Sequence, residues 1–587
     1  MTGAASALER AARLLDPLCD MLTKDRSPKF LVVLSLAMAG IFCLCIFDSG
    51  FLLGTSSFWK NPRGLNQYSW ADISTALSGY YYFTRDTWQL PLFQVSKLGA
   101  PAGTNIIFTD SIPWVALAGR LVFRATGMAV NLYGVWTACC FLASAAAMTA
   151  LTARLGQRSL AAGGMATIAG LCMPALLARW GHMSMMAQFE IVLALIFYLN
   201  HRRCDGPWRF FAHAALLMWL ALWTHTYIFV MVSTIVLTTL AQATRNRSQG
   251  GKSTAGILSG LILFIGTLIA LSGHMQTHGN LGAEGVGIFS MNLLSPFLPQ
   301  RSGLYPLFRD VVADGTGGQY EGFSYLGIGV LMLLLMSLPW QVQKLRQALR
   351  EHPWLFGLFV GLTLFALSNV IYLGPLQLLR IPLPDGILQF ASMFRATGRF
   401  FWPVMYLLAA LAIIGPLAFY GRRGALLLLV ALPLQWVDTE PLRREFAARV
   451  QVPEKSHIDP DSWEAVMGRH SSVRVLPQFF CLAARRGWNS EVAVQLQLLA
   501  ALADRPINTV YTARQTADCR AEKRIDGRPL RGARQLSVFF DEFSGFARIQ
   551  ALAATSNVCR SGPHIIACSD IPGQAEALAE LVQTDRK

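Results

Sequence analysis

Carboxylates that could act as bases stand between the long apolar runs of this 587-residue chain. Asp72 follows Trp70 and Ala71 and precedes an aromatic run at 80–83 that includes Tyr81. Aromatic rings at this density prefer the headgroup level of a membrane. A carboxylate held among them is partly desolvated, which raises its pKa and makes it a usable general base. The alternative interpretation is that Asp72 caps a helix.

A second carboxylate, Asp110, follows a turn that begins at Gly103. Ser111 and Pro113 come directly after it, in an order typical of a helix N-terminus, so capping alone would explain the pattern. The other interpretation is that Asp110 faces Asp72 across the same loop. We therefore take Asp72 and Asp110 as the candidate catalytic residues.

Two histidines, His182 and His225, close short turns between apolar runs. A histidine at a helix end often binds only a free carbonyl group. Glu190 lies two turns inside an apolar run, where carboxylates are rare and usually line a cavity or have a partner. Glu321 lies in a loop rich in acidic residues, for which exposure to water is the default explanation. We expect these four residues and Tyr81 to support one cavity.

The segment 394–403 carries Arg395 and Arg399 directly before an apolar run, together with aromatic residues that include Trp402. Arginine side chains bind phosphate oxygens through two parallel hydrogen bonds. We therefore expect Arg395, Arg399 and Trp402 to bind the phosphate and the chain of an anionic lipid. The alternative is that both arginines reach the lipid headgroups without a specific ligand.

The composition indicates which kind of element positions these residues. Hydrophobic residues make up 53% of the chain and charged residues only 14%, whereas soluble proteins carry about 25% charged residues. The net charge of +16 divides into +14 for residues 1–437 and +2 for residues 438–587. Because the excess of basic residues belongs to the apolar part, a nucleic-acid partner is excluded. The sequence predicts a mainly α polytopic membrane protein with a soluble C-terminal domain.

Apolar runs long enough for a membrane helix, which needs about 20 residues, occur repeatedly up to residue 437. The eleven expected spans are 30–53, 129–152, 159–179, 184–200, 209–224, 226–243, 255–272, 323–340, 354–374, 399–420 and 424–437. Residues 111–123 are apolar but short, which favours a helix at the membrane interface.

Basic residues in the short loops set the orientation of these spans. Alternate loops, beginning with the amphipathic segment 1–29, hold 18 basic and 6 acidic residues and are assigned to the cytoplasm. The large loops 54–128 and 273–322 then lie outside, as does the C-terminal domain 438–587. An odd number of spans agrees with ends on opposite sides.

The C-terminal segment 438–587 alternates strand-like and helix-like patterns, which predicts a small α/β domain. The expected strands are 473–480, 507–511, 535–540 and 564–567, and the expected helices are 491–503, 546–555 and 574–582. Four of the eleven cysteines lie here, and four cysteines allow three pairings. We favour Cys559 with Cys568, which closes a local loop, and Cys481 with Cys519. A zinc site is the weaker alternative, because the spacings match no common zinc finger.

At these residues the chain resembles the C-fold (GT-C) superfamily of membrane glycosyltransferases, and more narrowly an uncharacterised bacterial membrane-protein family within it. The stretches that carry the resemblance are Asp72 with 80–83, 108–113, 181–182, 225–227, 321–327 and 398–403. The resemblance implies an undecaprenyl-phosphate sugar donor, transfer on the outer face of a bacterial inner membrane, and a periplasmic C-terminal domain.

We therefore expect an enzyme that transfers a sugar from a polyprenyl-phosphate donor to a cell-surface glycan or lipid acceptor, with membrane lipids as further partners. The alternatives are a transporter or flippase for lipid-linked glycans and a non-catalytic envelope assembly protein. No cofactor is certain. Many relatives have two acidic residues adjacent or one apart in the first outer loop, whereas Ala71 and Ile73 flank Asp72 here. A divalent metal ion is a candidate cofactor on the resemblance alone.

Overall fold

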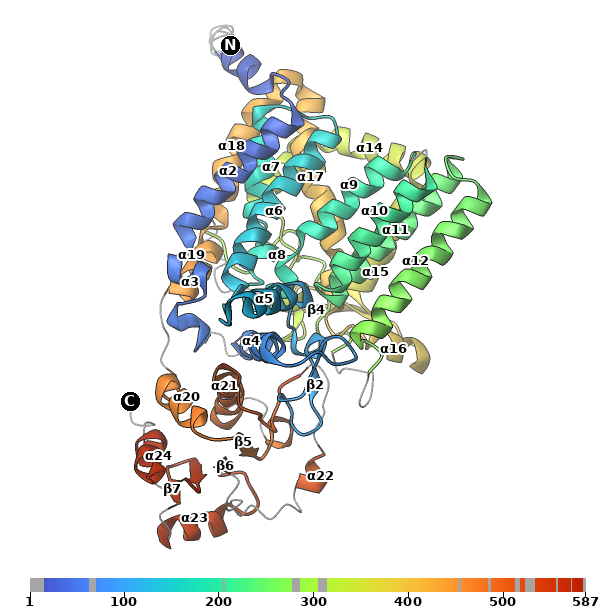
Figure 1. The fold of residues 1–587 in the computed structure, drawn as a ribbon. Coiled ribbons are helices and arrows are strands. Elements are labelled where there is room, and N and C mark those ends of the chain that lie inside the picture. Colours follow the sequence, from blue (N-terminus) through green and yellow to red (C-terminus); the bar gives the residue numbers. More distant parts are fainter. Residues whose placement is uncertain are drawn as a thin grey trace.

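The computed structural model consists of a helical bundle and a smaller C-terminal domain at one end of it (Figure 1). The N-terminal end of the described chain lies at the other end of the bundle (Figure 1). The structure describes residues 15–62, 70–203, 206–276, 285–304, 314–451, 456–483, 487–512, 518–522, 534–555, 558–571 and 573–583. The first fourteen residues of the expected amphipathic segment 1–29 lie outside the described residues, and 15–23 are mainly helical.

Helices form the bundle, and all of them except α14 (Leu338–Glu351), which is amphipathic and has no buried residue, are predominantly apolar. In chain order they are α2 (Pro28–Ile46), α6 (Tyr133–Arg154), α7 (Leu160–Leu171), α8 (Pro174–Leu177), α9 (Phe189–His201), α10 (Pro207–Leu222), α11 (Thr226–Arg245), α12 (Gly251–Ser272), α13 (Ile328–Met336), α14 (Leu338–Glu351), α15 (Pro353–Leu367), α17 (Trp402–Tyr420) and α18 (Gly424–Asp438). Each of the eleven expected spans overlaps at least one of these helices.

Seven helices of the described chain are long and apolar enough to cross a membrane, or eight if the bent pair α13 and α14 is one span. The expected number of eleven is not confirmed. α10 and α15 have 16 and 15 residues, too few at ~1.5 Å per residue for a hydrocarbon core of ~30 Å. α13 and α14 meet at 80°, and the 42-residue stretch Thr397–Asp438 counts once although it contains α17 and α18, which pack against each other.

Short elements cover the end of the bundle that faces the C-terminal domain. They are α3 (Ser49–Leu53), η1 (Ser57–Trp59), α4 (Trp70–Arg85), β1 (Gln94–Val95), β2 (Thr104–Asn105), η2 (Ile106–Thr109), α5 (Pro113–Thr126), η3 (Met183–Met186), η5 (Gln319–Gly322), β3 (Val370–Leu373), β4 (Leu376–Arg380), α16 (Asp385–Ala391) and η6 (Thr397–Phe401). The expected interfacial segment is α5, which lies across the ends of the long helices beside α4 (Figure 1). η7 (Gly421–Arg423) connects α17 to α18.

The C-terminal domain holds a four-stranded sheet in the order β5-β6-β8-β7. Its strands are β5 (Ser472–Leu476), β6 (Gln535–Phe540), β7 (Cys559–Ser561) and β8 (Ile565–Ser569), and only the β5–β6 pair is parallel. Its helices are α20 (Pro460–Gly468), α21 (Trp488–Leu502), α22 (Cys519–Glu522), α23 (Phe546–Thr555) and α24 (Gln574–Gln583), and η8 spans Phe479–Cys481. α19 (Glu440–Gln451), although it lies within the expected domain 438–587, packs on α2, α8 and α18 of the bundle. Disulfides join Cys481 to Cys519 and Cys559 to Cys568, the two pairings favoured above.

One expected strand of this domain does not form. In the segment 507–511 only Ile507 makes bridges, to Val473 of β5 and to Leu98 of the first large loop. Tyr511 instead turns toward α4, where its hydroxyl group contacts Asp72. Contacts with the bundle therefore replace sheet pairing in this segment.

Candidate functional site

Four side chains from four separate segments meet at the end of the bundle that faces the C-terminal domain. Asp72 lies in the first turn of α4, and Asp110 follows η2. His182 lies between α8 and η3, and His225 caps the start of α11. Because each residue stands at or near the end of a helix, its side chain can extend into the space between the elements.

Close packing of α4 on η2 brings the two carboxylates into one site. A Cβ atom at Gly79 would lie 2.4 Å from hydroxyl oxygens of both Thr109 and Ser111, so only glycine permits this approach. The Ser111 hydroxyl donates to the Ala76 carbonyl of α4 at 2.7 Å. Asp110 then adopts a left-handed conformation with φ of 58°, which aspartate tolerates better than most residues.

His182 bridges the two carboxylates. Its Nε2 lies 3.5 Å from Asp72 Oδ2, and its Nδ1 lies 3.4 Å from Asp110 Oδ2. Burial alone would lower the pKa of His182, but the charges of Asp72 and Asp110 raise it above its usual value. An imidazolium ion with an N–H bond toward each carboxylate satisfies all three groups.

Asp110 accepts from three donors. The Ser184 hydroxyl donates at 2.7 Å, and His182 and His225 approach at 3.4 Å each. His225 Nδ1 accepts the N–H group of Tyr227 at 3.1 Å, so its proton is on Nε2, which faces Asp110. Burial would raise the pKa of Asp110, but the bonds with His182 and His225 hold it well below its usual range. Asp110 is therefore a permanent anion that orients the imidazoles.

Asp72 has a different environment although it lies beside the same histidine. Burial raises its pKa to about 6, and the charge of His182 opposes this rise. The charges of Asp110 and Glu321 raise the pKa further, whereas a hydrogen bond from Tyr511 at 3.3 Å lowers it. Two neighbouring carboxylates whose pKa values differ strongly are typical of an acid–base site. In this pair, Asp72 is the group able to exchange a proton near neutral pH.

A buried ion cluster borders these groups. Glu321 Oε2 accepts from Arg179 at 2.5 Å and from Arg399 at 2.7 Å. Burial would raise the pKa of Glu321, but the two guanidinium groups hold it well below its usual range. Arg399 is 6% exposed, so its charge is shared with Glu321 rather than presented to a lipid surface.

Arg395 differs from Arg399, because its side chain is exposed. Its guanidinium carbon lies 4.4 Å from the ring centre of Phe289, and no carboxylate in the described part of the chain forms an ion pair with it. Its charge acts on Tyr511, which places it close to the carboxylate cluster. Of the two expected phosphate-binding arginines, Arg395 has the charge that is free to bind an anion.

Three further candidates lie outside this cluster. Trp402 is fully buried as the first residue of α17, with its ring centre 5.8 Å from the guanidinium carbon of Arg179, so it is not available to a lipid chain. Tyr81 is buried and packs on Tyr80. Glu190 is fully buried within α9 and accepts from Thr224 at 2.8 Å.

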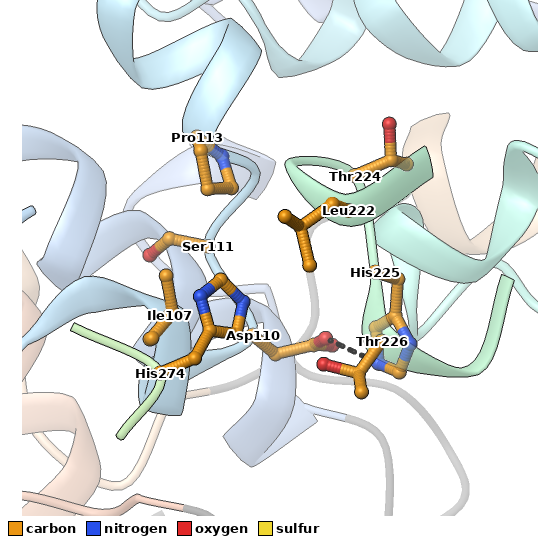
Figure 2. Close-up of a pocket in the computed structure, with 9 residues that line it drawn as sticks. All are labelled: Ile107, Asp110, Ser111, Pro113, Leu222, Thr224, His225, Thr226 and His274. Atoms are coloured by element: carbon orange, nitrogen blue, oxygen red, sulfur yellow. Dashed lines mark ion pairs between the residues drawn. The ribbon is translucent and has the colours of Figure 1, made fainter. Parts of the chain in front are cut away.

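A small cavity of about 40 Å³ lies beside Asp110, with room for roughly two or three waters. Its lining consists of Ile107, Asp110, Ser111, Pro113, Leu222, Thr224, His225, Thr226 and His274. Figure 2 shows Asp110 and His225 pointing toward one another, with the ion pair between them dashed. Thr224 connects this cavity to the buried Glu190.

The ligand atoms of the cluster do not suit a metal ion. Within the described residues, the one group of three metal-type ligands with atoms within 4.8 Å of one another is Cys481, Cys519 and Glu522. A disulfide joins those two cysteines, so their thiolates are not free. At Asp72 and Asp110 the imidazole of His182 occupies the space between the carboxylates. The candidate divalent cation therefore lacks a fitting ligand set at Asp72 and Asp110.

Three residues of the site did not follow from the sequence. Tyr511 stands in a segment with a strand pattern, and nothing near it in the sequence points to Asp72. Ser184 follows His182 by two residues, and a polar residue there at the start of an apolar run was a usable signal. Arg179 offered a second usable signal, because it is a basic residue on the predicted outer side, like Arg395 and Arg399.

Comparison with known families covers both parts of the chain. A family model described as "Domain of unknown function (DUF6311)" matches residues 36–440, which include the bundle and the site loops. A second model, described as "DUF6311 C-terminal domain", matches residues 462–569. A comparison with curated proteins gives no match.

Proposed function

The chain belongs to the DUF6311 family, and we propose that it is an integral-membrane glycosyltransferase of the GT-C type. It transfers a sugar from a polyprenyl-phosphate donor to a glycan or lipid acceptor of the cell surface. The observation that carries this proposal is the Asp72 carboxylate, whose two oxygens contact His182 and Tyr511 and whose pKa is about 6.

The reaction needs one base and one site for a leaving phosphate. The acceptor hydroxyl oxygen bonds to the anomeric carbon of the donor sugar while the bond from that carbon to the phosphate oxygen breaks. Asp72 takes the hydroxyl proton, and the bonding electrons leave with polyprenyl phosphate. Attack opposite to the leaving group inverts the configuration of the anomeric carbon.

The neighbours of Asp72 support its role as the base. The carboxylate is 18% exposed, so a substrate hydroxyl can reach it, and a pKa near the working pH suits proton transfer. Asp110 orients His182 from the opposite side of the ring. Because Asp110 is held as an anion by three donors, we assign it to positioning rather than to proton transfer.

The exposed charge of Arg395 supports binding of the donor phosphate. A phosphate that leaves with an extra negative charge is stabilised by a guanidinium group already in place. Arg179 and Arg399 share one carboxylate, Glu321, so this trio keeps a net charge of +1, but both guanidinium groups are buried and already bonded to Glu321. The donor phosphate therefore binds at Arg395, with its polyprenyl chain directed toward the bundle.

The arrangement of the chain supports a position in the bacterial inner membrane. The N-terminal end and the C-terminal domain lie at opposite ends of the bundle (Figure 1). With the N-terminus in the cytoplasm, the site and the two disulfides are in the periplasm, which permits disulfides. As part of the same proposal, the chain crosses this membrane eleven times.

The test is sugar transfer by the purified protein in proteoliposomes, with labelled undecaprenyl-phosphate monosaccharides and bacterial envelope acceptors. Asp72→Asn removes the base and keeps the size of the side chain, so transfer should fall by about 100- to 10,000-fold. Asp385→Asn, which changes an exposed carboxylate of α16, serves as the matched control. Undiminished transfer by the Asp72→Asn protein would remove Asp72 from the mechanism.

A transporter of lipid-linked glycans remains the second candidate because of one observation, the carboxyl group of Glu190 inside the bundle. Intramembrane carboxyl groups are common in transport pathways. The two functions separate in the same proteoliposomes. A transporter moves the intact labelled lipid to the other leaflet, whereas a transferase forms a new glycosidic bond and releases polyprenyl phosphate.

A further inference from the structure

The C-terminal domain contributes a side chain to the site. The Tyr511 hydroxyl lies 3.3 Å from Asp72 Oδ1, although 439 positions separate the two residues in the sequence. The other carboxylate oxygen, Oδ2, faces His182. Because each oxygen of Asp72 has its own partner on a different element, the plane of the carboxylate is defined.

Contacts within its own domain hold Tyr511 in this place. The N–H group of Tyr511 donates to Gln497 Oε1 at 2.8 Å, and Gln497 lies on α21. The phenol ring packs on Phe479, with ring centres 4.9 Å apart. η8 begins at Phe479 and ends at Cys481, which the disulfide joins to Cys519. The orientation of Tyr511 therefore depends on the folded domain.

The domain itself is docked on the bundle through α21. Residues 492–501 of this helix are all buried, so no face of it meets solvent along that stretch. A helix that is buried all round needs partners on every side. α21 packs on α4 on one side and on its own domain on the other. Without the bundle, the face of α21 that covers α4 would be exposed apolar surface.

Polar contacts complete this interface. Arg85 at the end of α4 donates to the carbonyl oxygens of Ala501 and Leu502 at 2.6 and 3.1 Å, where the helix dipole of α21 favours a cation. Lys97 pairs with Asp504 at 2.8 Å. The backbone of Ile507 exchanges hydrogen bonds with the first large loop, through the carbonyl of Lys97 and the N–H group at residue 100. The two parts of the chain thus share one backbone hydrogen-bond pattern.

We propose that the C-terminal domain is a fixed part of the site and that Tyr511 is a positioning residue, which orients the Asp72 carboxylate toward the acceptor hydroxyl. This inference rests on the proposed role of Asp72 as the base. A hydroxyl donor on Oδ1 and an imidazolium on Oδ2 leave the remaining lone pairs of Asp72 for the substrate.

The charged and titratable groups that face Asp72 come from four other elements. They are His182, Asp110, Glu321 and Tyr511. The hydrogen bond from Tyr511 favours the ionised form of Asp72 and so lowers its pKa. Replacing Tyr511 by Phe removes this bond and leaves the other three groups in place. The pKa of Asp72 should therefore rise by about half a unit to one unit.

The experiment measures protonation of Asp72 without any sugar substrate. Dicyclohexylcarbodiimide adds to a protonated carboxyl group, and mass spectrometry of the peptide with Asp72 gives the rate of labelling between pH 4.5 and 8.5. For the wild-type protein in nanodiscs we expect a midpoint near pH 6. Tyr511→Phe should move the midpoint upward with an unchanged melting temperature. Tyr420→Phe, which removes an exposed hydroxyl at the far end of α17, should not move it.

An unchanged midpoint in the Tyr511→Phe protein would overturn the inference, whether or not sugar transfer is found. If the midpoint rises but no donor gives a sugar-transfer product, the proposed function is contradicted, whereas the positioning role of Tyr511 stands. A raised midpoint with slower transfer below pH 7 and normal transfer at pH 9 is the result that both proposals require.

Discussion

Replacing His182 by glutamine tests how the site controls Asp72, the proposed base. The imidazolium of His182 is the group that lowers the pKa of Asp72 most, with Nε2 at 3.5 Å from Oδ2. Glutamine keeps a hydrogen-bond donor of similar reach but carries no charge. The pKa of Asp72 should then rise from about 6, and the form that can accept a proton should appear only at higher pH.

The size of this rise follows from the distance. Two unit charges about 4 Å apart interact by roughly 4 kcal/mol at an effective dielectric constant of about 20. His182 and Asp72 are 23% and 18% exposed, so we take about half of this value. About 2 kcal/mol corresponds to roughly 1.5 pKa units and places the pKa of Asp72 near 7.5.

Because Asp72 must be ionised to act as the proposed base, activity should be lost as the pH falls through this pKa. Relative to wild type, kcat/KM of His182→Gln should be about fourfold lower at pH 7, more than tenfold lower at pH 6 and nearly equal at pH 9. The assay is sugar transfer at limiting donor between pH 5 and 9. His274→Gln is the control, because burial lowers the pKa of His274 to about 4 and this ring is neutral throughout the range. A loss of equal size at every pH would refute the electrostatic reasoning.

The remaining predictions concern the arginines of the site. Arg395→Ala should raise KM for the donor about tenfold, since one charged hydrogen bond is lost, and Arg395→Lys should recover part of it; an unchanged KM in both would place the phosphate elsewhere. Glu321→Gln leaves Arg179 and Arg399 buried without a counter-charge and should lower the free energy of unfolding by about 3–5 kcal/mol. Glu440→Gln, at an exposed pair with Arg444, should change it by less than about 1 kcal/mol, and equal losses in thermal melts would contradict this account.

The sequence by itself determined the helices of the bundle and much of the C-terminal domain. Apolar runs and capping residues are local patterns, and they predicted helices such as α6 and α11 to within a few residues. In the C-terminal domain, the expected helix 546–555 coincides with α23, and both disulfide pairs agree with the favoured pairing, in which Cys559 and Cys568 close a local loop. Bends such as the one between α13 and α14 depend on packing and did not show in the hydrophobic pattern.

The tertiary structure decided what the chemical groups can do. Asp72 and Asp110 were recognisable as carboxylates in one loop, but the imidazole between them and the donors around each arise from distant segments. Arg395 and Arg399 are only four residues apart and look alike in the sequence. In the structure Arg399 is buried and pairs with Glu321 beside Arg179, whereas Arg395 is exposed. Tyr511 reaches Asp72 because α21, which binds the Tyr511 backbone, packs directly on α4. No local pattern encodes a contact between residues 439 positions apart. Residue types are written in the sequence, whereas pKa values and partners depend on burial and distance, which only folding sets.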